Sequence, residues 1–281
     1  MMNRADAEAL DVVRHARRDG RGVGAFNVVL LEHAEAIVAG AERAGLPVIL
    51  QISQNCVAYH GAFEPIGLAA LSLARHASVP VVVHLDHAED IELVNEAVAA
   101  GVHSVMYDGS RLPYDENVAV TRAVVDHCHA HGVVVEAELG EVGGKDGVHA
   151  PGVRTDPAEA AAFVAATGVD SLAVAVGTSH AMTERVATVD VDLIASLAKA
   201  LEVPLVLHGS SGLSDGELQG AVLAGMTKVN ISTHLNVLFT RALLEALDAP
   251  RPPVDPRRYV SAGRAAVALE VERLLRLLAN A

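Results

Sequence analysis

Residues 81–101 read VVVHLDHAEDIELVNEAVAAG and contain the unit that recurs along most of the chain. The unit opens with a run of valines, which favours a buried β-strand. After a polar turn it continues into an Ala- and Glu-rich segment with the propensity of a helix, which Gly101 would end. A strand followed by a crossover helix is the building block of a parallel sheet.

The same alternation of strand and helix extends from end to end of the sequence. The helical segments of crossover length include Glu32–Ala44, Ile91–Ala100, Asp115–His131 and Pro157–Thr167. The predicted strands are Val23–Val28, Val48–Ile52, Val81–Leu85, Ser104–Tyr107, Val133–Glu138, Ser171–Val176, Leu205–His208 and Lys228–Ser232. Eight strands in this pattern predict an α/β fold, a (β/α)8 TIM barrel. A doubly wound open sheet is the alternative, but it normally has fewer strands and a Gly-rich turn after the first.

No linker divides the chain, so we expect one domain over residues 1–281. This length is close to the roughly 250 residues of a typical barrel. The Pro-rich segment 248–256 would lead from the last barrel helix into a C-terminal helical extension at Ala262–Leu278.

Charge and composition exclude several classes of protein. The net charge of -14, without a basic stripe, argues against nucleic-acid binding, which depends on neutralising phosphates. Two cysteines, Cys56 and Cys128, are too few for a disulfide framework. No apolar run approaches the roughly 20 residues that span a bilayer, so no membrane association is expected. The N-terminus lacks the apolar core of a signal peptide, and we expect a cytoplasmic location.

Polar side chains gather where the predicted strands end. Strand 81–85 runs into Asp86 and His87, and later strands end at Asp108, at Glu138 and at His208. Because the active site of a TIM barrel lies at the carboxyl ends of its strands, these groups should converge there. A divalent metal is the simplest agent that would stabilise so many of them together.

Three histidines near three strand ends, His87, His180 and His208, form a plausible zinc set. Catalytic zinc takes three protein ligands and keeps one position open for substrate. Each histidine taken alone is equally well explained as an ordinary polar residue at the start of a loop.

The loops after strands seven and eight have the composition of a phosphate site. The turn His208–Gly212 reads HGSSG, and Asn230–Thr233 follows at the end of the last strand. Backbone N–H groups and small hydroxyls in these loops often bind phosphate in TIM barrels.

At these residues the sequence resembles the class II aldolases, which include fructose-bisphosphate and tagatose-bisphosphate aldolases and the related deoxy-phosphogluconate enzymes. The resemblance covers nearly the whole chain. Its motifs are HLDH at 84–87, YDGS at 107–110, VEAELG at 135–140, GG at 143–144, PLVLHG at 204–209, KVNI at 228–231 and DPR at 255–257.

The resemblance implies a catalytic Zn²⁺ bound by His87, His180 and His208. It also implies that Asp108 and Glu138 lie near an alternative or second position for a divalent or monovalent cation.

The resemblance further implies the acid and base groups. Asp86 would exchange a proton with the C4 hydroxyl of the sugar, and Asp146 stands where relatives carry a mobile-loop glutamate. A Schiff-base mechanism is disfavoured because the three lysines, Lys145, Lys199 and Lys228, do not lie at the carboxyl ends of predicted strands.

Substrate contacts are implied by the same comparison. Arg257 matches an arginine that reaches the aldehyde-side phosphate, often from a neighbouring subunit, so a homodimer or homotetramer is expected. The positions expected to bind the sugar or its phosphate are Asn27, Ser53, Ala181, Gly209, Ser211, Asn230, Ser232 and Thr233.

The sequence therefore predicts a zinc-dependent aldolase that cleaves a phosphorylated ketose to dihydroxyacetone phosphate and an aldehyde. Relatives usually carry glycine at position 181 and glutamate in the mobile loop, where this chain has Ala181 and Asp146. These departures motivate an alternative, a catalytically impaired barrel that binds metal and sugar phosphate as a sensor or partner subunit.

Overall fold

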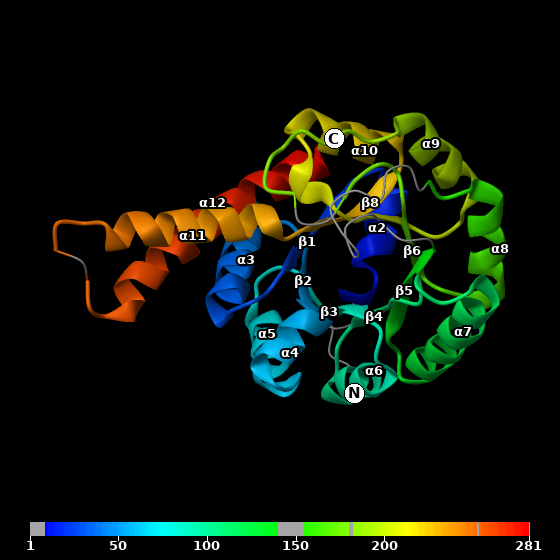
Figure 1. Cartoon of the computed structure of the whole chain (residues 1–281), viewed down its shortest axis with the longest axis horizontal. Coiled ribbons are helices and arrows are strands. Elements are labelled where there is room, and N and C mark those ends of the chain that lie inside the picture. The colour runs from blue at the N-terminus through cyan, green and yellow to red at the C-terminus, as the bar shows by residue number, and fades with distance from the viewer. Residues whose placement is uncertain (1–8, 140–153, 180–181, 252, 281) are drawn as a thin grey trace.

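The chain folds into a closed barrel of eight parallel strands in the order β1 to β8, with β8 paired to β1 (Figure 1). The computed structural model describes residues 9–139, 154–179, 182–251 and 253–280. The strands are β1 (Val23–Asn27), β2 (Val48–Ser53), β3 (Val81–Ala88), β4 (Ser104–Tyr107), β5 (Val134–Leu139), β6 (Ser171–Val174), β7 (Leu205–Leu207) and β8 (Met226–Ile231). The predicted TIM barrel is confirmed, and closure of the sheet excludes the doubly wound alternative.

Apart from the first described helix, which precedes β1 and closes one end, helices follow the strands and cover the outside of the barrel (Figure 1). They are α2 (Val12–Arg18), α3 (Leu31–Ala44), α4 (Gln54–His60), α5 (Glu64–His76), α6 (Ile91–Ala100), α7 (Tyr114–Ala130), α8 (Pro157–Thr167), α9 (Val191–Ala200), α10 (Asp215–Ala224), α11 (Thr233–Leu247) and α12 (Pro256–Ala279). Several begin at a side chain that accepts a hydrogen bond from the first turn, as at Asp90, Asp156, Asp190 and Ser214. The four crossover helices predicted from sequence are all present, with ends shifted by one residue at most.

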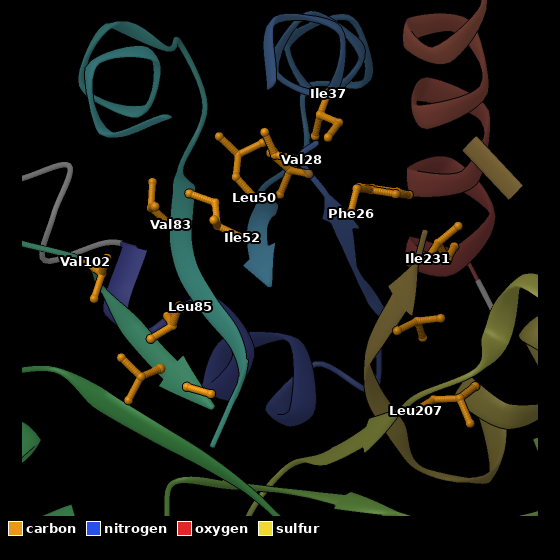
Figure 2. Close-up of a cluster of buried hydrophobic side chains, with 14 of the residues drawn as sticks. Phe26, Val28, Ile37, Leu50, Ile52, Val83, Leu85, Val102, Leu207 and Ile231 are labelled. Atoms are coloured by element: carbon orange, nitrogen blue, oxygen red, sulfur yellow. The ribbon is translucent and has the colours of Figure 1, made fainter. Parts of the chain in front are cut away.

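The main hydrophobic core lies between the strands and the surrounding helices. Alternate residues of a strand point to opposite faces, so Val83 and Leu85 of β3 face outward into this core. Figure 2 shows them with Phe26, and with Ile37 reaching from α3 toward the strands. Each fully buried side chain of this size contributes about 1.5–3 kcal/mol to folding.

The inward face of the barrel is apolar at one end and polar above it. At the amino ends of the strands, Val23, Ile49 and Val82 pack with Val12 of α2, which closes that end. Two residues further along β3 lies His84, which is 1% exposed. The inside of the barrel is therefore closed at the amino ends of the strands, and the polar groups lie toward their carboxyl ends.

The C-terminal extension begins earlier than the sequence indicated. Helix α12 starts at Pro256 rather than Ala262, because Asp255 caps it and Pro256 occupies its first turn. With α11 it forms a hairpin that projects from one side of the barrel (Figure 1). The rest of α12 packs against α3, where Gly40 leaves room for Ala268 and Val271. In the described part of the chain, no helix combines the length and the apolar character that crossing a bilayer requires.

Candidate active site

A cavity of about 170 Å³ opens at the carboxyl ends of the strands. Its lining consists of Asn27, Ser53, Asp86, His87, Gly209, Ser211, Asn230, Ser232 and Thr233. The structure thus brings together seven of the nine residues predicted to contact substrate, and it places Asp86 and His87 beside them. These residues come from β1, β2, β3, β8 and the loop after β7, so closure of the barrel assembles the cavity.

His87 lies where the backbone of β3 departs from regular pairing. The register with β4 shifts between Leu85 and Ala88, and His87 has φ of 50°, the only positive φ outside glycine among the described residues. Bulges, and non-glycine residues with a left-handed backbone conformation, cost energy and cluster at functional sites, where they redirect a side chain. Here the ring is aimed so that its Nδ1 lies 2.9 Å from Asp108 Oδ2, while Ser110 donates to Asp108 Oδ1 at 2.6 Å.

His208 is fully buried between two glutamates. Its Nδ1 lies 3.1 Å from Glu138 Oε2, and its Nε2 lies 3.1 Å from Glu136 Oε1. Burial opposes the charged imidazolium, but the hydrogen bonds and the negative charges of Glu136 and Glu138 together outweigh it and raise the pKa of His208 to about 9. The surroundings of this ring therefore favour a positive charge.

His87, Glu138 and His208 form a group that fits a metal ion. Their ligand atoms all lie within 4.8 Å of one another, and the two imidazole rings are 4.7 Å apart. Two histidines and a carboxylate are donors that zinc accepts. Asp108 contacts the Nδ1 of His87 instead of joining this group, which is the position of a residue that orients a metal-binding histidine.

Asp86 is held from one side and has an unpaired oxygen on the other. The Nδ2 of Asn27 donates to Asp86 Oδ2 at 3.0 Å, and Gln51 donates to Asn27 Oδ1 at 3.1 Å. Asp86 Oδ1 is buried and has no hydrogen-bond partner among the described residues. Burial opposes ionisation, but His87 is the largest of the nearby positive influences, and together they lower the pKa of Asp86. The result is an ionised carboxylate with one oxygen available to a ligand.

The opposite wall of the cavity is made of small polar groups. Gly209 has φ of 66°, and a Cβ there would lie 2.7 Å from the carbonyl oxygen of Ser179, so the turn requires glycine. The Ser232 N–H donates to Ser211 Oγ at 3.3 Å, and α11 begins at Thr233 with its amino end at the cavity. A helix amino terminus with adjacent hydroxyls favours an anion.

Other predicted site residues stand apart from this cavity. Arg257 lies at the start of α12, is 89% exposed and pairs with Asp255 at 2.7 Å. It is not part of the cavity lining in this chain. His180, Ala181 and Asp146 lie outside the described residues.

Two charged residues beside the site, Glu136 and Lys228, were not among the site residues predicted from sequence. Glu136 and Lys228 point into the barrel below His208, and Lys228 Nζ lies 2.7 Å from Glu136 Oε2. The feature of the sequence that could have identified them is the alternation of side chains along a strand. Glu136 shares one face of β5 with Glu138, and Lys228 shares one face of β8 with Asn230. Lys228 is buried inside the barrel and ion-paired with Glu136.

Comparisons with known proteins identify the family of the chain. The family model of class II fructose-bisphosphate aldolase matches residues 7–281. The chain is 38% identical over 264 residues to a 6-phospho-5-dehydro-2-deoxy-D-gluconate aldolase of Shouchella clausii (strain KSM-K16), covering 93% of this chain and 90% of that protein.

Solved structures show the same relationship. The crystal structure of the YdjI aldolase from Escherichia coli K12 superposes with a TM-score of 0.84 at 32% identity and covers 96% of both chains. The fructose-bisphosphate aldolase of Campylobacter jejuni has a TM-score of 0.79 at 23% identity, covering 98% of this chain and 94% of that one, and shows the shared fold. The chain therefore belongs to the class II fructose-bisphosphate aldolase family and is an aldolase, a carbon–carbon lyase.

Proposed function

We propose that this enzyme is a zinc-dependent aldolase that reversibly cleaves a phosphorylated ketose to dihydroxyacetone phosphate and an aldehyde. The observation that carries the proposal is that one residue, His87, belongs both to the metal-binding group and to the lining of the cavity. Asp86 and the helix amino terminus of α11 face that same cavity.

The donor set supports zinc and assigns the ligand atoms. Asp108 holds Nδ1 of His87, so Nε2 would be the ligand atom of that ring, with Glu138 and His208 completing the described part of the set. His180 is proposed as a further ligand from its place in the sequence. When bound, a zinc ion would polarise the ketose carbonyl and stabilise the negative charge left as the carbon–carbon bond breaks.

Proton transfer is assigned to Asp86. In the cleavage direction its Oδ1 would accept the proton of the hydroxyl on the carbon that becomes the aldehyde, and in condensation it would return that proton. Asn27 keeps the other oxygen engaged at 3.0 Å, which orients the carboxylate toward the cavity. Asp146 is proposed, from its position in the sequence, to move the proton on the dihydroxyacetone phosphate carbon.

The phosphate would bind at the opposite wall. The N–H groups at the start of α11 and in the turn at Gly209, with the hydroxyls of Ser211, Ser232 and Thr233, offer donors without a formal positive charge. The buried Oδ1 of Asn230 has no partner among the described residues and would accept from a substrate hydroxyl.

The sugar phosphate and the assembly are also part of the proposal. Fructose 1,6-bisphosphate, tagatose 1,6-bisphosphate and 6-phospho-5-dehydro-2-deoxy-D-gluconate are the substrates to compare, the last because a relative with 38% identity is named for it. Arg257 stands exposed on the projecting hairpin, where it would serve a neighbouring subunit in a cytoplasmic homodimer or homotetramer. The sensor alternative gains no support, because the relatives compared are named as aldolases.

A coupled assay tests the proposal. Each substrate is incubated with zinc-loaded enzyme, with chelator-treated enzyme and with enzyme to which zinc has been restored. Dihydroxyacetone phosphate is followed by its reduction with NADH. We expect turnover of at least one substrate that chelator abolishes and zinc restores. No product from any of the three, with zinc bound, would refute the proposal.

A further inference from the structure

A charged pair lies inside the barrel below the proposed metal site. Lys228 and Glu136 are each 2% exposed, and Lys228 Nζ lies 2.7 Å from Glu136 Oε2. On its other side Lys228 Nζ lies 3.4 Å from His84 Nε2, and His84 Nδ1 lies 2.7 Å from Ser104 Oγ. A buried ion pair is costly to desolvate and is weak evidence of stabilisation, so its presence calls for another explanation.

Glu136 connects this pair to the proposed metal site. Glu136 uses Oε2 for Lys228 and Oε1 for Nε2 of His208 at 3.1 Å. Each of the two carboxylate oxygens of Glu136 is therefore engaged by a different partner. Glu136 is thus a fixed acceptor aimed at Nε2 of His208.

The two nitrogens of His208 have different surroundings. A neutral imidazole carries one N–H and one lone pair, and only the lone pair can bind a metal. Nδ1 faces Glu138, which belongs to the metal-binding group with His87, whereas Nε2 faces Glu136, whose second oxygen is taken by Lys228. Metal-binding histidines commonly donate their other N–H to a carboxylate, which fixes the tautomer.

We infer that Glu136, held in place by Lys228, positions His208 by accepting its Nε2–H, so that Nδ1 is presented to the metal. This inference rests on the proposed zinc site. It assigns Glu136 and Lys228 as positioning residues that act through His208, and it explains why a lysine is kept inside the barrel.

Zinc affinity is the first measurement, made on purified variants by competition with a chromophoric chelator. The double variant Glu136→Leu/Lys228→Met removes the acceptor together with both charges, so no unpaired charge stays buried. We expect its zinc affinity to fall about 10–100-fold, the usual effect of losing such a partner. Glu136→Gln/Lys228→Met keeps a neutral acceptor, and we expect it to recover part of that loss.

A matched control separates positioning from general stability. Ser104→Ala removes the contact with His84, at the far end of the same series of buried side-chain contacts. It leaves Glu136 in contact with His208. We expect it to lower Tm without changing zinc affinity. Visible spectra of the Co²⁺-substituted proteins should change in the Leu/Met variant and stay unchanged in the control.

The inference is overturned if the Leu/Met variant folds and binds zinc with the parent affinity and the parent Co²⁺ spectrum. If that variant does not fold, the tautomer of His208 in the parent protein tests the inference instead. Nitrogen NMR of the zinc-loaded enzyme should show His208 protonated at Nε2, and protonation at Nδ1 would overturn the inference. A parent enzyme that binds no zinc would refute the proposed function itself, and this inference with it.

Discussion

Replacing Asp86 with asparagine tests the proposed proton transfer with little change in shape. Asp86 Oδ2 accepts from the Nδ2 of Asn27 at 3.0 Å, and Asn27 is itself held by Gln51. In Asp86→Asn the new amide must keep its oxygen toward Asn27, since two N–H donors cannot face each other. Its NH2 group then points to the position now held by the unpaired Oδ1.

The substitution therefore turns an acceptor into a donor at the place where the substrate hydroxyl is expected. Loss of a general acid or base typically lowers kcat by roughly 10²–10⁴-fold. At about 1.4 kcal/mol for each factor of ten, this is about 3–5 kcal/mol of transition-state stabilisation. Zinc content should be unchanged, because Asp86 is not one of the group formed by His87, Glu138 and His208.

The assay compares kcat and KM for cleavage with zinc content and Tm of the same preparations. We expect kcat to fall while zinc stays at the parent level and Tm changes by a few degrees at most. Asn27→Ala serves as a companion, because it removes the orienting donor and keeps the carboxylate, so its loss should be smaller. A parent kcat in Asp86→Asn would refute the assignment and move the proton transfer to another group.

Three further predictions, made with four variants, have defined outcomes. His87→Ala or His208→Ala should each lose bound zinc and cleavage together, measured by metal analysis, and full zinc in either would remove that residue from the ligand set. Gly209→Ala should cost roughly 1–3 kcal/mol of stability by chemical denaturation and raise KM, because alanine resists a φ of 66°; unchanged values would show that the turn tolerates a Cβ. Burial opposes ionisation of Glu270, but Arg273 chiefly lowers its pKa to about 2. Because this folded-state pKa lies below the unfolded one, its stabilisation is complete above about pH 4.5 and is lost as pH falls toward 2. Glu270→Gln should therefore lower Tm at pH 7 and have a shrinking effect in acid, and a constant difference across that range would contradict the assignment.

The local pattern of the chain was sufficient for the barrel. Valine runs alternate with helix-forming stretches, and glycine ends five of the helical segments with positive φ: Gly45, Gly101, Gly132, Gly168 and Gly225. The errors were at the boundaries. Helix α12 begins at Pro256 because a cap at Asp255, not the helix propensity of the following residues, sets its start.

Much of the site could also be predicted from sequence, because the carboxyl ends of parallel strands must meet at one end of a barrel. The residues predicted there, such as Asp86, Gly209 and Asn230, do line one cavity. Asp108 shows the limit of this reasoning. Strand order places it near the proposed metal site, but only its contact with Nδ1 of His87 shows which ring it would orient.

Sequence by itself thus determined the architecture and the end of the barrel that holds the chemistry, since both depend on local periodicity and on which residues follow each strand. Tertiary structure alone decided the pairing of groups far apart in the chain. Lys228 lies on β8, Glu136 lies on β5, and His208 directly follows β7. The three side chains meet because closure of the barrel brings the inward faces of these strands together. Only that meeting distinguishes the two nitrogens of His208, because a buried charge takes its role from its nearest partner and not from its neighbours in sequence.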